Sequence, residues 1–216
     1  MRCNMADILR MAKERRLTNR TIIIQVKGCL LPDADVLKDY FEGSAIEEAC
    51  KVGCPNYGKK WSCPPFSKPF PQIANLYSSA YLLCFSTEMC SYSDVKNGYL
   101  AVKAANVTLK SLIERCARQI EEETGGYALL SGSCRQCKPC RCKNGLPCQH
   151  PDKMRYSMEA AALNVQRICL DFLDHHLLWY QNKNLPEFTS VVSLILHNQH
   201  LSRCNLENLV NRAFIE

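Results

Sequence analysis

Cysteine is the feature that most constrains this chain, which has 15 of them among 216 residues. A small secreted protein would pair its cysteines as disulfides, but this count is odd and the N-terminus lacks the apolar segment of a secretory signal. In a reducing compartment, unpaired cysteines serve mainly as metal ligands, nucleophiles or small core residues. We therefore expect a cytoplasmic protein whose cysteines are to be interpreted by their spacing.

Eight of the 15 cysteines lie in two short windows, and the other seven stand alone. The first window, CKVGCPNYGKKWSCPP, occupies 50–65 and holds three, whereas the second occupies 134–151 and holds five. Pro and Gly interrupt both windows, so we expect two Cys-rich loops. Structural roles are expected for the seven isolated cysteines, which are Cys3, Cys29, Cys84, Cys90, Cys116, Cys169 and Cys204.

The second window has the spacing of an iron–sulfur loop. Cys134, Cys137 and Cys140 are separated by two residues each, which lets three thiolates surround one face of a [4Fe–4S] cluster while backbone N–H groups point at the sulfides. Cys148 can supply the fourth ligand. Cys142 is either a bystander or an alternative ligand, because it lies too close to Cys140 to share the cluster with it. Zinc is the main competitor, since Cys-x2-Cys is also a zinc knuckle.

The first window offers three thiolates, Cys50, Cys54 and Cys63, and no fourth. Three cysteines can hold a [4Fe–4S] cluster that leaves one iron open to a substrate as a Lewis acid. A fourth ligand can instead come from Cys29, Cys90 or a histidine, or the two windows can build a single site together. We therefore expect one or two clusters in the chain, with zinc as the alternative metal.

Charged and aromatic residues accompany both windows. The second window carries four basic residues, Arg135, Lys138, Arg141 and Lys143. They either offset thiolate charge or dock an acidic redox partner such as a ferredoxin or flavodoxin. In the first window, Tyr57, Lys59 and Trp61 either belong to a solvated loop or provide substrate contacts and a proton source.

Few other residues have the character of ligands. His150 can donate a hydrogen bond to a cluster sulfur or belong to a turn. His175 and His176 are adjacent on a predicted helix and point in two directions, so they cannot chelate one metal. Ser157 is predicted to cap a helix whose positive end Glu159 complements, although a carboxylate this near a cluster can also relay protons.

Hydrophobic periodicity predicts both helices and strands. Helices are expected at 5–16, 33–42 and 95–123, one or two helices at 156–179, and a turn at 44–50. Strands are expected at 21–26, 80–87, 127–131 and 188–197. We predict a single domain, 1–216, of the α/β class, more closely an α+β sandwich. It would have one central sheet of about four to five strands, flanking helices and the two Cys-rich loops at 50–65 and 134–151.

The two windows together resemble a known family. CPNYGKKWSCPP after Cys50, and Cys134-x2-Cys137-x2-Cys140 followed by PCQHPDKMRYSMEA, are similar to the two signatures of the predicted metal-binding proteins called domain of unknown function 2284. The resemblance covers residues 20–200. It implies cytoplasmic iron–sulfur or metal binding, as in the anaerobic bacteria and archaea where such proteins are widespread, but no particular reaction. The ligands that it implies are Cys50, Cys54, Cys63, Cys134, Cys137, Cys140 and Cys148.

Three functions stay open at this point. The chain can be an electron-transfer or cluster-carrying protein, an enzyme that uses an open iron at the first window for sulfur or metalloid chemistry, or a zinc-stabilised interaction module. It has no phosphate-binding loop and no Rossmann glycine pattern, so chemistry dependent on ATP or NAD is not expected. The net charge of +6 is mild and dispersed, and no apolar run approaches the ~18 residues of a membrane span. We therefore expect neither nucleic-acid nor membrane binding.

Overall fold

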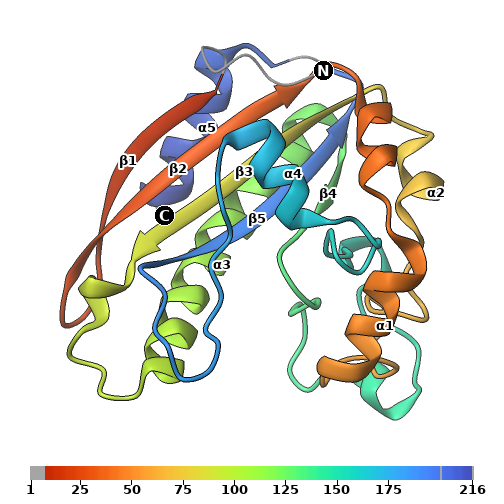
Figure 1. The fold of residues 1–216 in the computed structure, drawn as a ribbon. Helices are drawn as coiled ribbons and strands as arrows, with labels where there is room; N and C mark the ends of the chain where they lie inside the picture. Colours follow the sequence, from red (N-terminus) through yellow and green to blue (C-terminus); the bar gives the residue numbers. More distant parts are fainter. Residues whose placement is uncertain (1–7, 200, 216) are drawn as a thin grey trace.

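The computed structural model describes residues 8–199 and 201–215. They contain one five-stranded antiparallel sheet in the order β1-β2-β3-β5-β4 (Figure 1). The strands are β1 (Leu9–Arg16), β2 (Thr21–Leu31), β3 (Ser79–Glu88), β4 (Tyr127–Leu129) and β5 (Phe188–His197). The architecture is α+β with a single central sheet, which confirms the predicted fold class.

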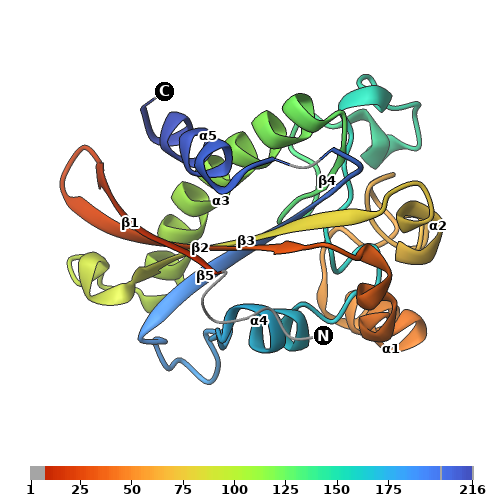
Figure 2. The same ribbon diagram turned by 90° about the horizontal axis from the view of Figure 1, so that it is seen from above.

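Helices cover both faces of this sheet. Figure 2 shows α3 and α5 above it and α4 and α1 below it. The helices are η2 (Ala34–Tyr40), α1 (Gly43–Gly53), α2 (Phe70–Ala74), η3 (Met89–Tyr92), α3 (Gly98–Thr124), η4 (Arg141–Asn144), η5 (Pro151–Lys153), α4 (Val165–Leu173) and α5 (Arg203–Ile215). No helix in the described part of the chain has the length and apolar character needed to cross a bilayer.

The side chains of the central strands alternate between two separate cores. On β3, Tyr81 and Phe85 pack into the core under α3 and α5, whereas Leu82 and Cys84 pack into the core that contains α4. Since both faces are covered, β3 and β5 are buried almost throughout and appear in the sequence as continuous apolar runs. These runs are the signal behind the predicted strands at 80–87 and 188–197, which the structure confirms.

The long helix α3 matches the predicted helix at 95–123 to within a few residues. Its N-cap is Asn97, whose side chain accepts a hydrogen bond from the N–H of Leu100. Its C-cap is Gly125, whose φ of 60° lies in the left-handed region that glycine adopts without strain. The buried stripe of α3 packs against the sheet, so its opposite edge is free to carry polar residues.

The predicted helix at 5–16 is wrong over its described part. Leu9–Arg16 is instead the edge strand β1, which pairs with β2 in continuous register from Leu9 and Gly28 to Arg16 and Thr21. Burial along β1 alternates with a period of two. Pairing with a long neighbouring strand therefore outweighs the helical spacing of the apolar residues, and the many charges suit an edge strand that must not pair with other chains.

The predicted helix at 156–179 is much shorter in the structure. Only Val165–Leu173 is helical, between the cap Asn164 and Asp174, which adopts a left-handed φ of 47°. Ser157 therefore caps no helix: its hydroxyl accepts a hydrogen bond from the N–H of Ala160 inside a turn. His175 and His176 lie beyond the helix end. In the other direction, the expected turn at 44–50 is part of helix α1.

Strand β4 is only three residues long, and this length shapes the molecule beside it. β4 pairs with the end of β5 from Leu194 to Leu196. Among the described residues, no strand pairs with that edge of β5 over 188–193. Helix α3 lies on one side of the sheet here, and the Cys-rich windows lie near β4 and α1 (Figure 1). The space next to this open edge becomes the cavity described below.

Candidate metal centre

The cysteines of the first window lie where helix α1 ends. Cys50 is in the last turn of α1, and the N–H of Cys54 donates to the carbonyl of Cys50 at 3.0 Å. Pro55 cannot continue the helix, so the chain turns and brings in Cys63. Cys54 is exposed, Cys50 is half-buried and Cys63 is buried. These three side chains line the same cavity.

The three thiols of the first window interact with one another electrostatically. Burial raises the pKa of Cys50, and the neighbouring Cys54 and Glu159 raise it further. Burial also raises the pKa of Cys63, although a hydrogen bond with Ser62 and the charge of Lys60 act against the shift. A bound metal would have to displace these thiol protons, so metal binding here should release protons.

The second window forms a loop whose five cysteines share a second, smaller cavity. This loop follows β4 and contains η4 and η5. Cys142, which the sequence left as a bystander or an alternative ligand, is buried and lines the same cavity as the others. The cysteines of this group are Cys134, Cys137, Cys140, Cys142 and Cys148. None of the cysteines within the described ranges lines both cavities, so the two windows build two separate groups.

Hydrogen bonds between sulfurs divide the charge unevenly within the second group. The pKa of Cys140 is lowered. Burial alone would raise this pKa, but its effect is outweighed by hydrogen bonds from the backbone and thiol of Cys142 and from the thiol of Cys137. The positive charge of Lys60 lowers the pKa further. Burial and the hydrogen bond to Cys140 raise the pKa of Cys142 to about 11. Cys140 therefore becomes a thiolate more readily than Cys137 or Cys142, whose pKa values are raised.

Residues between Cys54 and Cys63 hold the second loop against the first. The ammonium of Lys60 donates to the carbonyl of Cys134 at 2.7 Å and to the hydroxyl of Ser133 at 3.1 Å. The hydroxyl of Ser62 accepts from the N–H of Cys134 at 3.2 Å. The two groups of cysteines are thus neighbours, and Lys60 interacts with thiols in both of them.

The aromatic residues of the first window have different roles in the structure. Tyr57 lines the larger cavity, and Lys59 is exposed. Trp61 lines the smaller cavity, and its indole N–H donates to the carbonyl of Leu146 at 2.9 Å. Trp61 therefore supports the second loop, and Tyr57 is the one of the three that a molecule in the larger cavity would meet.

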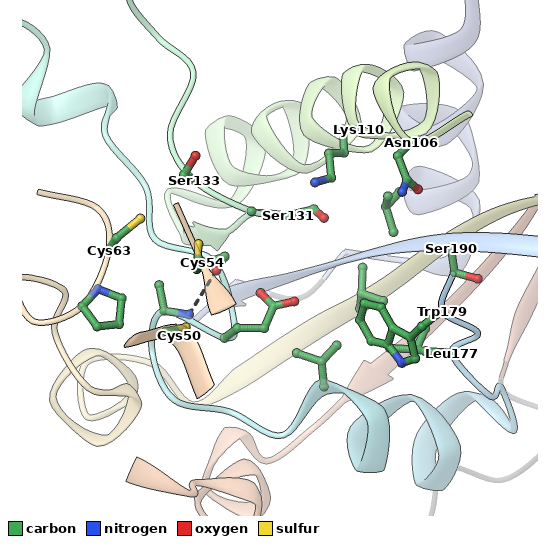
Figure 3. A pocket seen from close by; sticks show the side chains of 18 of the residues that line it. Cys50, Cys54, Cys63, Asn106, Lys110, Ser131, Ser133, Leu177, Trp179 and Ser190 are labelled. Carbon is green, nitrogen blue, oxygen red and sulfur yellow. Dashed lines mark hydrogen bonds between the residues drawn. The ribbon is translucent and has the colours of Figure 1, made fainter. Parts of the chain in front are cut away.

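The larger cavity extends from the first group of cysteines along the open edge of β5. Its volume is about 240 Å³. Figure 3 shows the three cysteines at one end, Lys110 and Asn106 projecting from α3, and Ser190, Trp179 and Leu177 farther away. The other residues that line it include Tyr57, Ser131, Ser133, Ser157, Glu159, Val191 and Val192.

Several polar groups of this cavity lack protein partners. Lys110 is half-buried, and burial lowers its pKa, with Glu159 acting in the opposite direction and Arg135 in the same one. Among the described residues, neither the Lys110 ammonium nor the Glu159 carboxylate has a hydrogen bond or an ion pair. The hydroxyl of Ser190 does have a partner, since it lies 2.8 Å from Nε2 of His175.

The polar residues Lys110, Asn106 and Ser190 were missed by the sequence analysis. They come from the middle of α3 and from β5, more than 70 positions apart, and no local motif marks them. Glu159 was considered, but for a helix cap or a proton relay. Only the fold brings these side chains beside the first window.

The other candidates for a fourth ligand lie elsewhere. Cys90 is exposed in η3, and Cys29 is buried on β2 and takes part in a disulfide, contrary to the expectation that the cysteines do not pair. His150 lines the smaller cavity, and its carbonyl accepts from the N–H of Met154 in a turn. Within residues 8–199 and 201–215, no three His, Cys, Asp or Glu side chains are arranged to hold one metal ion.

The comparison with known families agrees with this cysteine chemistry. Residues 38–197 match the family described as predicted metal-binding protein (DUF2284). The chain belongs to the DUF2284 family. The DUF2284 match includes both groups of cysteines and the cavity, and it leaves out β1, β2 and α5. No curated protein and no solved structure matches the chain. Metal binding through a cysteine-rich centre is therefore the property of the DUF2284 family that bears on this site.

Proposed function

We propose that this chain is an iron–sulfur protein with [4Fe–4S] clusters at its two groups of cysteines. The second group would hold one cluster through Cys134, Cys137, Cys140 and Cys148, with Cys142 as the alternative ligand. The first group would hold another through Cys50, Cys54 and Cys63. The donor set fits this assignment, because soft thiolates are the ligands of iron–sulfur clusters, and zinc is the other metal that they suit.

The observation that carries the proposal is the contact between the two groups. Lys60 and Ser62, which precede Cys63 in the chain, both hydrogen-bond to the 133–134 segment. Two redox groups held side by side in this way could exchange electrons directly. The Lys60 ammonium would also offset part of the negative charge of two thiolate-bound clusters.

The second group is suited to exchange electrons with a partner protein. Its loop exposes the side chains of Lys138, Arg141 and Lys143, while Arg135 is paired with Glu114 at 2.8 Å. The loop from Cys134 to Cys148 contains no acidic residue. An acidic carrier such as a ferredoxin or flavodoxin would therefore dock here by charge complementarity, and such docking weakens as salt increases.

The first group is suited to chemistry, because it faces a cavity rather than the surface alone. An iron–sulfur cluster supplies one-electron transfer, and an iron that lacks a protein ligand also supplies Lewis acidity. Residues of the chain would handle protons and water. Tyr57 and Glu159 lie at the cavity wall, where they can hold or move a proton. Pro64 and Ala160 also line the cavity and would limit the access of water. This arrangement favours an enzyme of sulfur or metalloid chemistry over a simple carrier.

Metal and sulfide analysis of anaerobically purified protein tests the proposal. Two clusters predict about eight iron atoms and about eight acid-labile sulfides per chain, and one cluster predicts about four of each. Cys137→Ser should remove the second cluster and Cys54→Ser the first, with distinct losses in the paramagnetic resonance of the reduced protein. Cys204→Ser, at an exposed position of α5, is the matched control. Zinc without sulfide would refute the iron–sulfur assignment.

A further inference from the structure

The cavity beside the first group of cysteines contains two opposite charges that act on each other at a distance but form no ion pair among the described residues. Lys110 and Glu159 both line it, and among the described residues neither side chain forms a hydrogen bond or an ion pair. Partly buried charges without partners are costly unless a ligand or water completes them. A cavity that keeps both signs unpaired indicates a ligand that carries both signs.

The positive end of the cavity is built by one face of helix α3. Asn106 and Lys110 are four residues apart, so they lie on the same face and about 6 Å apart along the helix axis. The carbonyl oxygen of the Asn106 side chain accepts from the hydroxyl of Thr189 at 2.9 Å. This bond turns the amide NH2 of Asn106 away from Thr189. The amide NH2 and the Lys110 ammonium are therefore two adjacent donors, and such a pair binds a carboxylate.

The negative end is held by the turn that precedes helix α4. The hydroxyl of Ser157 accepts from the N–H of Ala160, and the carbonyl of Glu159 accepts from the N–H of Ala162 at 2.9 Å. The backbone around Glu159 is therefore fixed, while its carboxylate remains free of protein donors. It lines the same cavity as Lys110 and Cys50, and its charge acts on both of them.

The remaining wall is apolar and sets the size of the ligand. Leu177, Trp179, Val191 and Val192 contribute to it, at the edge of β5 that no described strand covers. A volume of about 240 Å³ is the space of roughly eight water molecules. This is smaller than the pockets of drug-sized ligands and suits a molecule as small as an amino acid.

Lys110 is not simply the counter-charge of the thiols. The lysine whose charge acts on Cys63 and Cys140 is Lys60, whereas the charges that act on Lys110 are those of Glu159 and Arg135. Lys110 is thus available to a ligand in the cavity.

We propose that this cavity binds a small zwitterion of amino-acid size. Its carboxylate would accept hydrogen bonds from Lys110 and Asn106, its ammonium would donate to Glu159, and its side chain would lie against Leu177 and Trp179. The position of this ligand beside a metal centre rests on the function proposed above, but the binding itself does not depend on it.

Binding to the anaerobically purified protein tests the proposal. Each standard amino acid is first screened by its effect on the thermal unfolding midpoint, which a ligand of the native state raises. An amino acid that binds is then compared by calorimetry with two analogues, one without the ammonium and one without the carboxylate; for L-leucine these are 4-methylpentanoate and 3-methylbutylamine. Each analogue is expected to bind about tenfold more weakly or worse, because each loses one charge-assisted contact.

Variants assign the two contacts to their residues. Lys110→Gln and Asn106→Asp should weaken binding of the amino acid about tenfold or more, whereas the amine analogue should bind no more weakly than before. Glu159→Gln should likewise weaken binding of the amino acid, whereas the carboxylic acid analogue should bind no more weakly than before. Asn106→Asp preserves the shape of the side chain and its acceptor for Thr189, so the fold is retained. Lys103→Gln, exposed on the same helix, is the matched control.

The outcomes separate the two proposals. Failure of every amino acid to bind would overturn the cavity assignment, whatever the iron content of the sample. Binding of the carboxylic acid or of sulfate as tightly as the amino acid, with no effect of Glu159→Gln, would also overturn it, since the site would then recognise only an anion. Amino-acid binding by a protein without iron and sulfide would support the cavity and refute the clusters.

Discussion

Glu121 of α3 is predicted to be the residue whose loss most destabilises the second Cys-rich loop without touching a cysteine. Its carboxylate is buried and accepts from Nε of Arg155 at 2.5 Å and from the N–H of Ala128 at 2.7 Å. Arg155 in turn donates to the carbonyls of Asp152 and Met154, just after the loop. One carboxylate thus joins the helix, strand β4 and the end of the loop.

The expected cost of Glu121→Ala follows from these contacts. Removing one partner of a buried ion pair costs about 3–5 kcal/mol, mainly because the other charge is left unpaired. The Arg155 side chain keeps 16% of its surface exposed and also stacks over Tyr127, so water and the ring would still stabilise its charge in part. The lower end of the range, about 3 kcal/mol, is therefore expected. Glu121→Gln keeps an acceptor for Ala128 and should cost about half as much.

Urea unfolding followed by circular dichroism measures these differences, with all proteins at equal metal content and with the slope against urea checked for constancy. Glu122→Ala, at the next and exposed position of the helix, is the control and should stay within about 0.5 kcal/mol of the original protein. If Glu121→Ala cost no more than this control, the joining role of the carboxylate would be refuted.

Three further predictions concern other parts of the chain. Gly126→Ala should destabilise the protein by about 2 kcal/mol or more in the same urea assay, because an added Cβ would collide with the carbonyl oxygen of Leu196; a neutral effect would contradict the close approach. Burial, then the hydrogen bond to Asp171, raises the pKa of Tyr40 to about 12, so the folded state holds this proton more tightly than the unfolded one. The stabilisation that protonated Tyr40 gives the folded state is complete below pH ~10 and is lost as pH rises towards 12. The free energy of unfolding should therefore fall less steeply over that pH window in Tyr40→Phe than in the original protein. Equal slopes in the two proteins would contradict the raised pKa of Tyr40. Cys84→Ser should leave the iron and sulfide content unchanged, since Cys84 is buried on β3 away from both cavities, and a loss of iron on analysis would show that assignment to be wrong.

Those features that depend on short stretches of sequence were predictable. A few neighbouring residues are enough to recognise the apolar runs of β3 and β5, the caps of α3 and the two cysteine windows. The segment Leu9–Arg16 could not be assigned in this way, because its strand conformation comes from pairing with β2 rather than from its own preferences.

The candidate site was predictable only in part, for the same reason. The spacing of the cysteines shows which thiols belong to each group, but the contact between the groups depends on the position of Lys60 and Ser62 in the folded chain. The cavity depends on still more distant residues, since Lys110 and Glu159 are brought together across the sheet edge. A polar residue at a half-buried helix position resembles any surface residue until the neighbouring elements are in place.

The shortness of β4 offers a way to sort members of this family by sequence. Were the strand after the long helix to continue by a few residues, its backbone would occupy the space now open beside Ser190 and Val192, and nothing could enter next to the first trio of thiols. Chains in which small residues follow a three-residue strand after one further position, as Ser131-Gly132-Ser133 follow Leu130 here, would keep the entrance. The length of a single strand would then distinguish members in which a small molecule can reach these thiols from members in which it cannot.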